Sequence, residues 1–170
     1  MKILICGDVN AGKSTLIRRL EPLFGREPRG YITVRMPEDE AGVSEVYLYD
    51  RANPPGDVRD SAVIMRFFPD GRAEKHPELL DTLGAGYLED IPEGSLVILD
   101  EIGTLETDAP SFQRAVLRIL EGSYDVLASV KAQNTDFLRT VRSYPGCELF
   151  IITPRNREEL FLQLEELVKL

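Results

Sequence analysis

A glycine-rich stretch near the start of the chain constrains its fold more than any other feature. Residues 7–15 read GDVNAGKST, and they match the pattern GxxxxGK[ST] at Gly7, Gly12, Lys13 and Ser14. The stretch follows an apolar run, KILIC at residues 2–6, and precedes a helical pattern. This strand–loop–helix context is what a phosphate-binding loop requires. The dinucleotide pattern GxGxxG fails, because Val9 stands where its second glycine belongs.

Each residue type in this stretch has a physical role. Glycine permits backbone angles and close approaches that a side chain forbids, so the N–H groups of the loop can point inward as an anion nest. Lys13 is expected to reach the β- and γ-phosphates, and Ser14 to give its hydroxyl oxygen to Mg²⁺. Asn10 stands where such loops often carry glycine, and asparagine tolerates a left-handed backbone. We expect nucleotide contacts from Gly7, Asp8, Val9, Asn10, Ala11, Gly12, Lys13, Ser14 and Thr15.

Short apolar runs alternate with helical patterns along the chain, which predicts an α/β layered fold with a mostly parallel sheet. Strands are predicted at residues 2–6, 30–36, 43–50, 62–68, 95–100, 124–130 and 147–153. Helices are predicted at residues 14–24, 77–91, 111–122, 134–144 and 157–170. The gaps between the second, third and fourth strands are rich in turn residues and too short for helices. These strands therefore predict an antiparallel insertion after the first helix.

Composition narrows the class of protein. A chain of 170 residues with 43% hydrophobic and 29% charged residues predicts one globular domain over residues 1–170. No apolar run is long enough to cross a membrane. Residues 1–6 are predicted to be a buried strand rather than part of a signal peptide. The net charge of −9 argues against broad nucleic-acid binding, which needs a basic surface.

The two cysteines predict no disulfide framework and no metal site. Cys6 and Cys147 both lie in apolar runs, and no CxxC spacing exists. Buried, reduced thiols are therefore expected, and they favour a cytoplasmic location. No pattern in the sequence identifies a protein partner.

A second motif, SLVILDEIG at residues 95–103, carries two acidic residues at the end of an apolar run. A buried parallel strand delivers its C-terminal residues to the sheet edge where a phosphate loop lies. Asp100 is expected to hold Mg²⁺, and Glu101 to orient and deprotonate a water molecule. A carboxylate beside the metal-binding aspartate favours hydrolysis of a nucleoside triphosphate over transfer of its phosphate to a second substrate.

The motifs together resemble the family of small stand-alone nucleoside-triphosphatases found in thermophilic microbes, which has a human relative. The resemblance rests on GDVNAGKSTL (7–16), GYITVR (30–35), LVILDEIGTLE (96–106), VLASV (126–130) and ITPRNREEL (152–160). It implies a RecA-like three-layer P-loop fold that hydrolyses ATP, GTP and other nucleoside triphosphates with Mg²⁺. It also implies that Asn156 and Arg157, a late NR pair, lie near the base. The sequence departs from the family at Val9–Asn10, where Pro-Gly is usual.

Several residues keep two interpretations. Arg35, at the end of the family's second-strand motif, could stabilise charge on the γ-phosphate or be a surface arginine. His76 is expected to lie in a loop or cap, and the acidic run at residues 38–40 to be a solvated turn. Two rival functions stay open: a nucleotide or small-molecule kinase with an acceptor pocket from residues 37–75, and a regulatory nucleotide-binding module.

Overall fold

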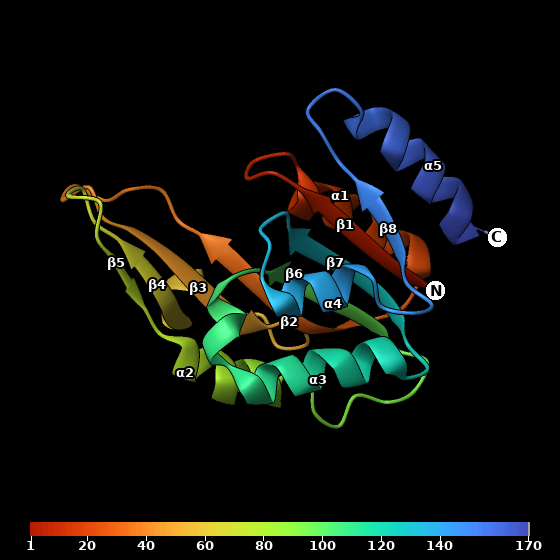
Figure 1. Ribbon diagram of the computed structural model, residues 1–170, viewed down its shortest axis with the longest axis horizontal. Coiled ribbons are helices and arrows are strands. Elements are labelled where there is room, and N and C mark those ends of the chain that lie inside the picture. Colours follow the sequence, from red (N-terminus) through yellow and green to blue (C-terminus); the bar gives the residue numbers. More distant parts are fainter. Residues whose placement is uncertain (170) are drawn as a thin grey trace.

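A single eight-stranded sheet organises the computed structural model, which describes residues 1–169 (Figure 1). Its strand order is β5-β4-β3-β2-β6-β7-β1-β8. The strands are β1 (Lys2–Gly7), β2 (Pro28–Arg35), β3 (Ser44–Asp50), β4 (Ala62–Phe67), β5 (Ala73–Lys75), β6 (Leu96–Ile102), β7 (Asp125–Lys131) and β8 (Glu148–Ile151). The helices are α1 (Lys13–Leu20), α2 (Pro77–Leu79), α3 (Pro110–Glu121), α4 (Asp136–Arg142) and α5 (Arg157–Lys169). Within residues 1–169, no helix has the length and hydrophobicity to span a membrane.

The parallel part of the sheet confirms the predicted α/β class and the RecA-like core. Strands β2, β6, β7, β1 and β8 are parallel neighbours. Strand β7 lies between β1, which leads into the glycine loop, and β6, which ends in the acidic pair. Because all these strands run the same way, their carboxyl ends meet at one edge and bring both motifs together.

The predicted antiparallel strands are confirmed, and they extend the main sheet on one side. Strand β2 pairs in parallel with β6 on one side and antiparallel with β3 on the other. Strands β4 and β5 continue the antiparallel pairing outward, to the left of the view in Figure 1. Strand β5 was not predicted, because its three residues, AEK, are all exposed and carry no apolar periodicity.

Helices cover both faces of the sheet and form the predicted three layers. Helices α1 and α5 lie together on one face, and α2, α3 and α4 on the other (Figure 1). Side chains of β1 alternate between the two cores: Ile3 and Ile5 pack with α1 and α5, whereas Leu4 packs with α3 and α4. Both faces are thus apolar, which explains why β1 and β6 are uninterrupted hydrophobic runs.

Three predicted helices differ from the structure in length, and the one predicted at 134–144 is α4 at Asp136–Arg142. The helix predicted at 14–24 is α1 followed by a 3₁₀ turn at Glu21–Phe24, and Gly25 ends it with a φ of 62°. The helix predicted at 77–91 is shorter: α2 widens into a π turn at Leu80–Gly84 and stops before Asp90, whose φ of 50° lies in the left-handed region. The last residue of the helix predicted at 157–170 lies outside the described residues.

Replacing Phe112, in the core beneath α3, is expected to destabilise the protein strongly. Its side chain is fully buried and packs edge-to-face against Tyr31, with ring centroids 5.2 Å apart. We expect Phe112→Ala to lower the free energy of unfolding by about 3–5 kcal/mol, because it leaves a cavity in a close-packed core. Denaturant unfolding measures the change. The control Leu162→Ala, at a residue 57% exposed on α5, should change it by less than about 0.5 kcal/mol.

Candidate active site

The glycine loop joins β1 to α1 in a conformation that only certain residues allow. Gly12 has a φ of 106°, and Asn10 has a φ of 62°, the left-handed conformation expected for an asparagine in this position. At Gly7, a Cβ atom would lie 2.5 Å from the Ile152 carbonyl oxygen of the neighbouring segment. The loop therefore needs a left-handed backbone at two positions and a missing side chain at a third.

Lys13 begins α1 and folds back over the loop. Its side chain is buried, and Nζ donates to the carbonyl oxygens of Gly7 and Asp8, each at 2.9 Å. The same Nζ lies 3.2 Å from Oε2 of Glu101. The ammonium group is thus held over the loop by acceptors from both motifs. Lys13 and Glu101 themselves lie 88 residues apart in sequence.

Asp100 is a buried carboxylate that Ser14 and Ser129 contact. It is 4% exposed, and its Oδ1 accepts hydrogen bonds from Ser14 Oγ at 2.9 Å and Ser129 Oγ at 2.7 Å. Burial raises the pKa of Asp100, and the two serine hydroxyls oppose that shift. A buried carboxylate of this kind favours a cation beside it.

The oxygen atoms of Ser14 and Asp100 fit the expected magnesium site. Mg²⁺ prefers oxygen ligands and often takes only one or two from the protein, with the rest from phosphates and water. Among residues 1–169, no cluster of three or more His, Cys, Asp or Glu side chains could hold a metal without such help. The pair supplies the one or two oxygen ligands that Mg²⁺ often takes from a protein.

Glu101 lies between two lysines. Its Oε2 is 3.2 Å from Lys13 Nζ, and its Oε1 is 3.2 Å from Lys131 Nζ. Lys131 ends β7, and a Cβ atom on Gly103 would lie 3.0 Å from its Cδ. No motif in the sequence points to a role for Ser129 or Lys131. The sequence does contain a signal for both residues: the run VLASVK is otherwise apolar, but it has a serine inside it and a lysine at its end.

A cleft of about 460 Å³ opens along this edge of the sheet. Of the residues expected to contact nucleotide or catalyse its reaction, the cleft is lined by Val9, Asn10, Gly12, Lys13, Ser14, Thr15, Arg35, Glu101 and Arg157. Lys131 and Glu106 line it as well. The cleft is therefore shared by the glycine loop, the acidic strand end and the antiparallel strands.

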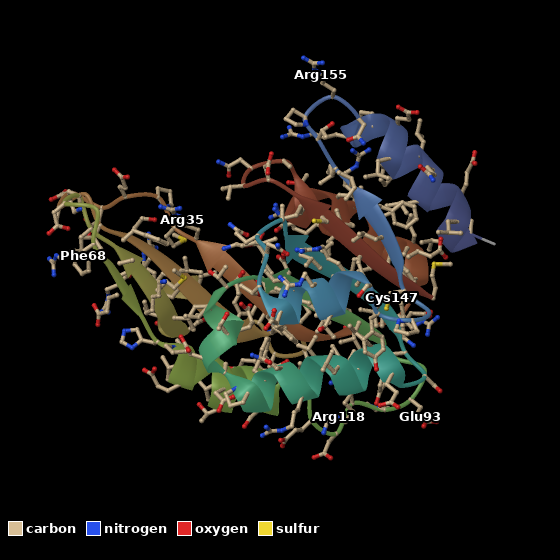
Figure 2. The ribbon with its side chains drawn as sticks, in the orientation of Figure 1. Arg35, Phe68, Glu93, Arg118, Cys147 and Arg155 are labelled. Atoms are coloured by element: carbon tan, nitrogen blue, oxygen red, sulfur yellow. The ribbon has the colours of Figure 1, made fainter. Side chains whose placement is uncertain are left out.

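Arg35 lies at the end of β2 on the side of the antiparallel strands (Figure 2). Its Nε donates to Ser44 Oγ at 3.0 Å, and its guanidinium lies 4.4 Å from the centroid of the Phe67 ring. The side chain is thus held at the wall of the cleft by β3 and β4.

Asn156 and Arg157, the NR pair, have different structural roles. Arg157 reaches the loop: its Nε donates to the Ala11 carbonyl at 2.6 Å, and its Nη2 to the Asn10 carbonyl at 2.7 Å. Asn156 instead closes the turn between β8 and α5, where its Oδ1 accepts from the Thr153 N–H at 2.7 Å. The geometry places only Arg157 in direct contact with the glycine loop.

Two further expectations concern residues outside the cleft. His76 precedes α2, and its ring nitrogens contact Glu74 and Glu78 at 3.1 and 2.9 Å. The acidic run at 38–40 forms a turn, in which Asp39 accepts hydrogen bonds from two backbone N–H groups. Both structural interpretations are confirmed.

Comparison with known proteins decides the family. A family model described as NTPase matches residues 2–164. The chain belongs to this NTPase family. The nucleoside-triphosphatase THEP1 of Thermotoga petrophila is 28% identical over 99% of this chain and 93% of its own. THEP1 of Methanothermobacter thermautotrophicus is 27% identical over 99% of this chain and 96% of its own. These relatives confirm the resemblance seen in the sequence.

Two solved structures share the NTPase-family fold. The crystal structure of THEP1 from Aquifex aeolicus matches with a TM-score of 0.75 and 21% identity, covering 100% of both chains. The solution structure of a human cancer-related nucleoside triphosphatase matches with a TM-score of 0.70 and 17% identity, covering 99% of this chain and 97% of its own. The predicted P-loop fold is confirmed.

Proposed function

We propose that this member of the NTPase family acts as a single domain that hydrolyses Mg²⁺-bound nucleoside triphosphates to diphosphate and phosphate. One observation carries the proposal: the Glu101 carboxylate lies 3.2 Å from Lys13 Nζ, beside the Asp100–Ser14 pair. A group able to accept a proton from water is thus adjacent to groups suited to a terminal phosphate and its metal. The names of the THEP1 relatives support the same activity.

The loop and Lys13 would bind the phosphates. Backbone N–H groups at the start of α1 favour anions, and the positive end of the helix adds to this attraction. Lys13 would exchange its carbonyl contacts at Gly7 and Asp8 for phosphate oxygens. Ser14 and Asp100 would hold Mg²⁺, which neutralises charge on the β- and γ-phosphates when bound.

Glu101 would position and deprotonate the attacking water. The phosphate groups attract both lysines that now pair with this carboxylate, and that attraction frees Glu101 to accept a proton. Lys131 and Arg35 line the same cleft as cations from β7 and β2. We assign them to neutralising charge that develops on the γ-phosphate.

Ser129 is expected to affect Mg²⁺ binding indirectly, without contacting the metal itself. Its hydroxyl is fully buried and orients Asp100 through a 2.7 Å hydrogen bond. Ser129→Ala should raise the Mg²⁺ concentration needed for half-maximal phosphate release by about tenfold, because partners of metal ligands tune metal affinity on that scale. A magnesium titration at saturating ATP measures the shift. Ser143→Ala, at a hydroxyl that caps a carbonyl on α4, should leave the titration curve unchanged.

Replacing Arg157 is expected to weaken nucleotide binding. Its guanidinium fixes the loop through the carbonyls of Asn10 and Ala11. Arg157→Ala should weaken nucleotide binding by about tenfold, because hydrogen bonds from a charged donor contribute about 1.5–3 kcal/mol. Equilibrium titration with a fluorescent ATP analogue gives the dissociation constant. Arg155 is exposed and points outward from the same turn (Figure 2), so equal losses in Arg155→Ala would contradict the assignment.

A nucleotide panel tests the proposed function. Asn156 and Arg157 lie on the β8 side of the loop, where we place the base. Neither residue offers a set of donors and acceptors dedicated to one base, so ATP, GTP, CTP and UTP should be hydrolysed at rates within about tenfold of one another. Phosphate release with each nucleotide alone measures this. Strict dependence on one base, or no phosphate release without a second substrate, would contradict the proposed function.

We further propose that the protein acts in the cytoplasm.

A further inference from the structure

The cleft contains a second compartment that the proposed hydrolysis does not use. Its wall, here called the apolar compartment, consists of Val46, Ile64, Met65, Phe67, Leu80 and Leu105. Arg35 of β2 lies opposite Val46 of β3, which in turn lies opposite Met65 of β4. Directly opposed residues share one face of a sheet. The antiparallel strands thus continue the cleft past Arg35 as a hydrophobic surface.

The apolar compartment lies beyond the space that a triphosphate would fill. Strands β2 and β3 separate β4 from β6, which carries Glu101. Three strand spacings amount to about 14 Å. The loop and Arg157 lie on the other side of β6, toward β1 and β8. A nucleotide held by the loop, with its base on the β8 side, leaves the compartment open.

A buried carboxylate with one unpartnered oxygen lies beside this compartment. Glu106 is 3% exposed, lines the cleft, and has no hydrogen bond to Oε2 from any group in residues 1–169. Burial raises the pKa of Glu106 to about 7, while the backbone N–H of Gly103 opposes the shift. An unsatisfied buried acceptor is costly and rare in native structures. Oε2 itself is enclosed, so a donor that enters from the cleft would satisfy it once the Glu106 side chain turns toward the compartment.

We propose that the apolar compartment binds a small uncharged alcohol while nucleotide occupies the loop. The hydrocarbon body would pack against Ile64 and Met65, and the hydroxyl would donate to Glu106 Oε2. This site goes beyond the proposed hydrolysis, and nothing in that activity requires it.

The lining of the compartment selects an uncharged ligand. Its six side chains are apolar, so a charged group held among them would lose its hydration without an ion pair in return. A hydroxyl carries a much smaller penalty and still provides the donor that Glu106 lacks.

Methyl NMR of the full chain tests the site without any turnover. The chain has three methionines: Met65 reports on the compartment, and exposed Met1, which precedes β1, serves as an internal reference. Benzyl alcohol and toluene are the probes, because they match in shape and differ in the hydroxyl. We expect benzyl alcohol to shift the Met65 methyl signal with an affinity about tenfold higher than that of toluene.

Two variants separate the contributions. Glu106→Leu should remove the preference for the alcohol, so that both probes bind alike. Val46→Phe should fill part of the compartment and weaken both probes. Equal binding of the two probes by the native chain, or an unmoved Met65 signal up to the solubility of benzyl alcohol, would overturn the proposal.

A competition experiment separates the compartment from the base site. The benzyl alcohol shift at Met65 should persist when a non-hydrolysable ATP analogue saturates the protein with Mg²⁺. Displacement by that analogue, but not by inorganic triphosphate, would assign the compartment to the base and overturn the proposal. Because these titrations need no hydrolysis, they stay informative even if the proposed nucleoside-triphosphatase activity fails its own test.

Discussion

Replacing Glu101 with glutamine should lower the rate of phosphate release by about 10²- to 10⁴-fold, the usual contribution of a general base. Glutamine keeps the size of the side chain but cannot accept a proton from water. The change also removes the negative charge that lies 3.2 Å from both Lys13 and Lys131. Both ammonium groups are then available to the phosphates, so nucleotide binding should be unchanged or tighter.

Phosphate release and equilibrium nucleotide binding, measured on the same preparation of Glu101→Gln, separate these two effects. Glu78→Gln is a matched control, because Glu78 is exposed beside His76 on α2. It should keep the native rate. Turnover by Glu101→Gln at the native rate would show that another group activates the water, and a loss of nucleotide binding would show that Glu101 acts in binding.

Replacing Lys13 with alanine should reduce turnover by about 10²- to 10³-fold, the effect of removing one charged contact to a developing anion. Unlike the Glu101 variant, it should also weaken nucleotide binding, because Lys13 acts on the ground state as well. The substitution leaves the Gly7 and Asp8 carbonyls without their 2.9 Å donor. The loop should therefore lose order as well as charge.

Thermal unfolding with and without MgATP measures this loss of binding, because a ligand that binds only the folded state raises the unfolding temperature. The rise seen with the native chain should shrink or vanish in Lys13→Ala. Lys75→Ala, at an exposed lysine on β5, should keep the full rise and the native turnover. Native affinity and turnover in Lys13→Ala would contradict the assignment of the glycine loop.

Apolar periodicity was sufficient to predict the parallel sheet. Buried runs such as KILIC and SLVILD are hydrophobic on both faces, and only a strand covered by helices on both sides requires that. The π turn at Leu80–Gly84 and the exposed strand β5 were missed. Each depends on tertiary packing, which overrides local preference and leaves no repeat in the sequence.

The acidic pair and the glycine loop were predictable because their spacing within each motif is local. Contacts between segments that are distant in the sequence were not predictable. Ser129 reaches Asp100 across 29 residues, and Arg157 reaches Ala11 across 146. Such contacts depend on which strands are neighbours. That order, with β7 between β1 and β6, could be inferred only from the family resemblance.

In the proposed reaction, water activated in this cleft attacks the γ-phosphate. The most direct measurement is to incubate the native chain with MgATP in ¹⁸O-enriched water, with no other acceptor present, and to analyse both products by mass. We predict steady formation of ADP without label and of phosphate with one ¹⁸O atom from solvent. Label in ADP, or bound nucleotide that stays intact without a second substrate, would contradict the account.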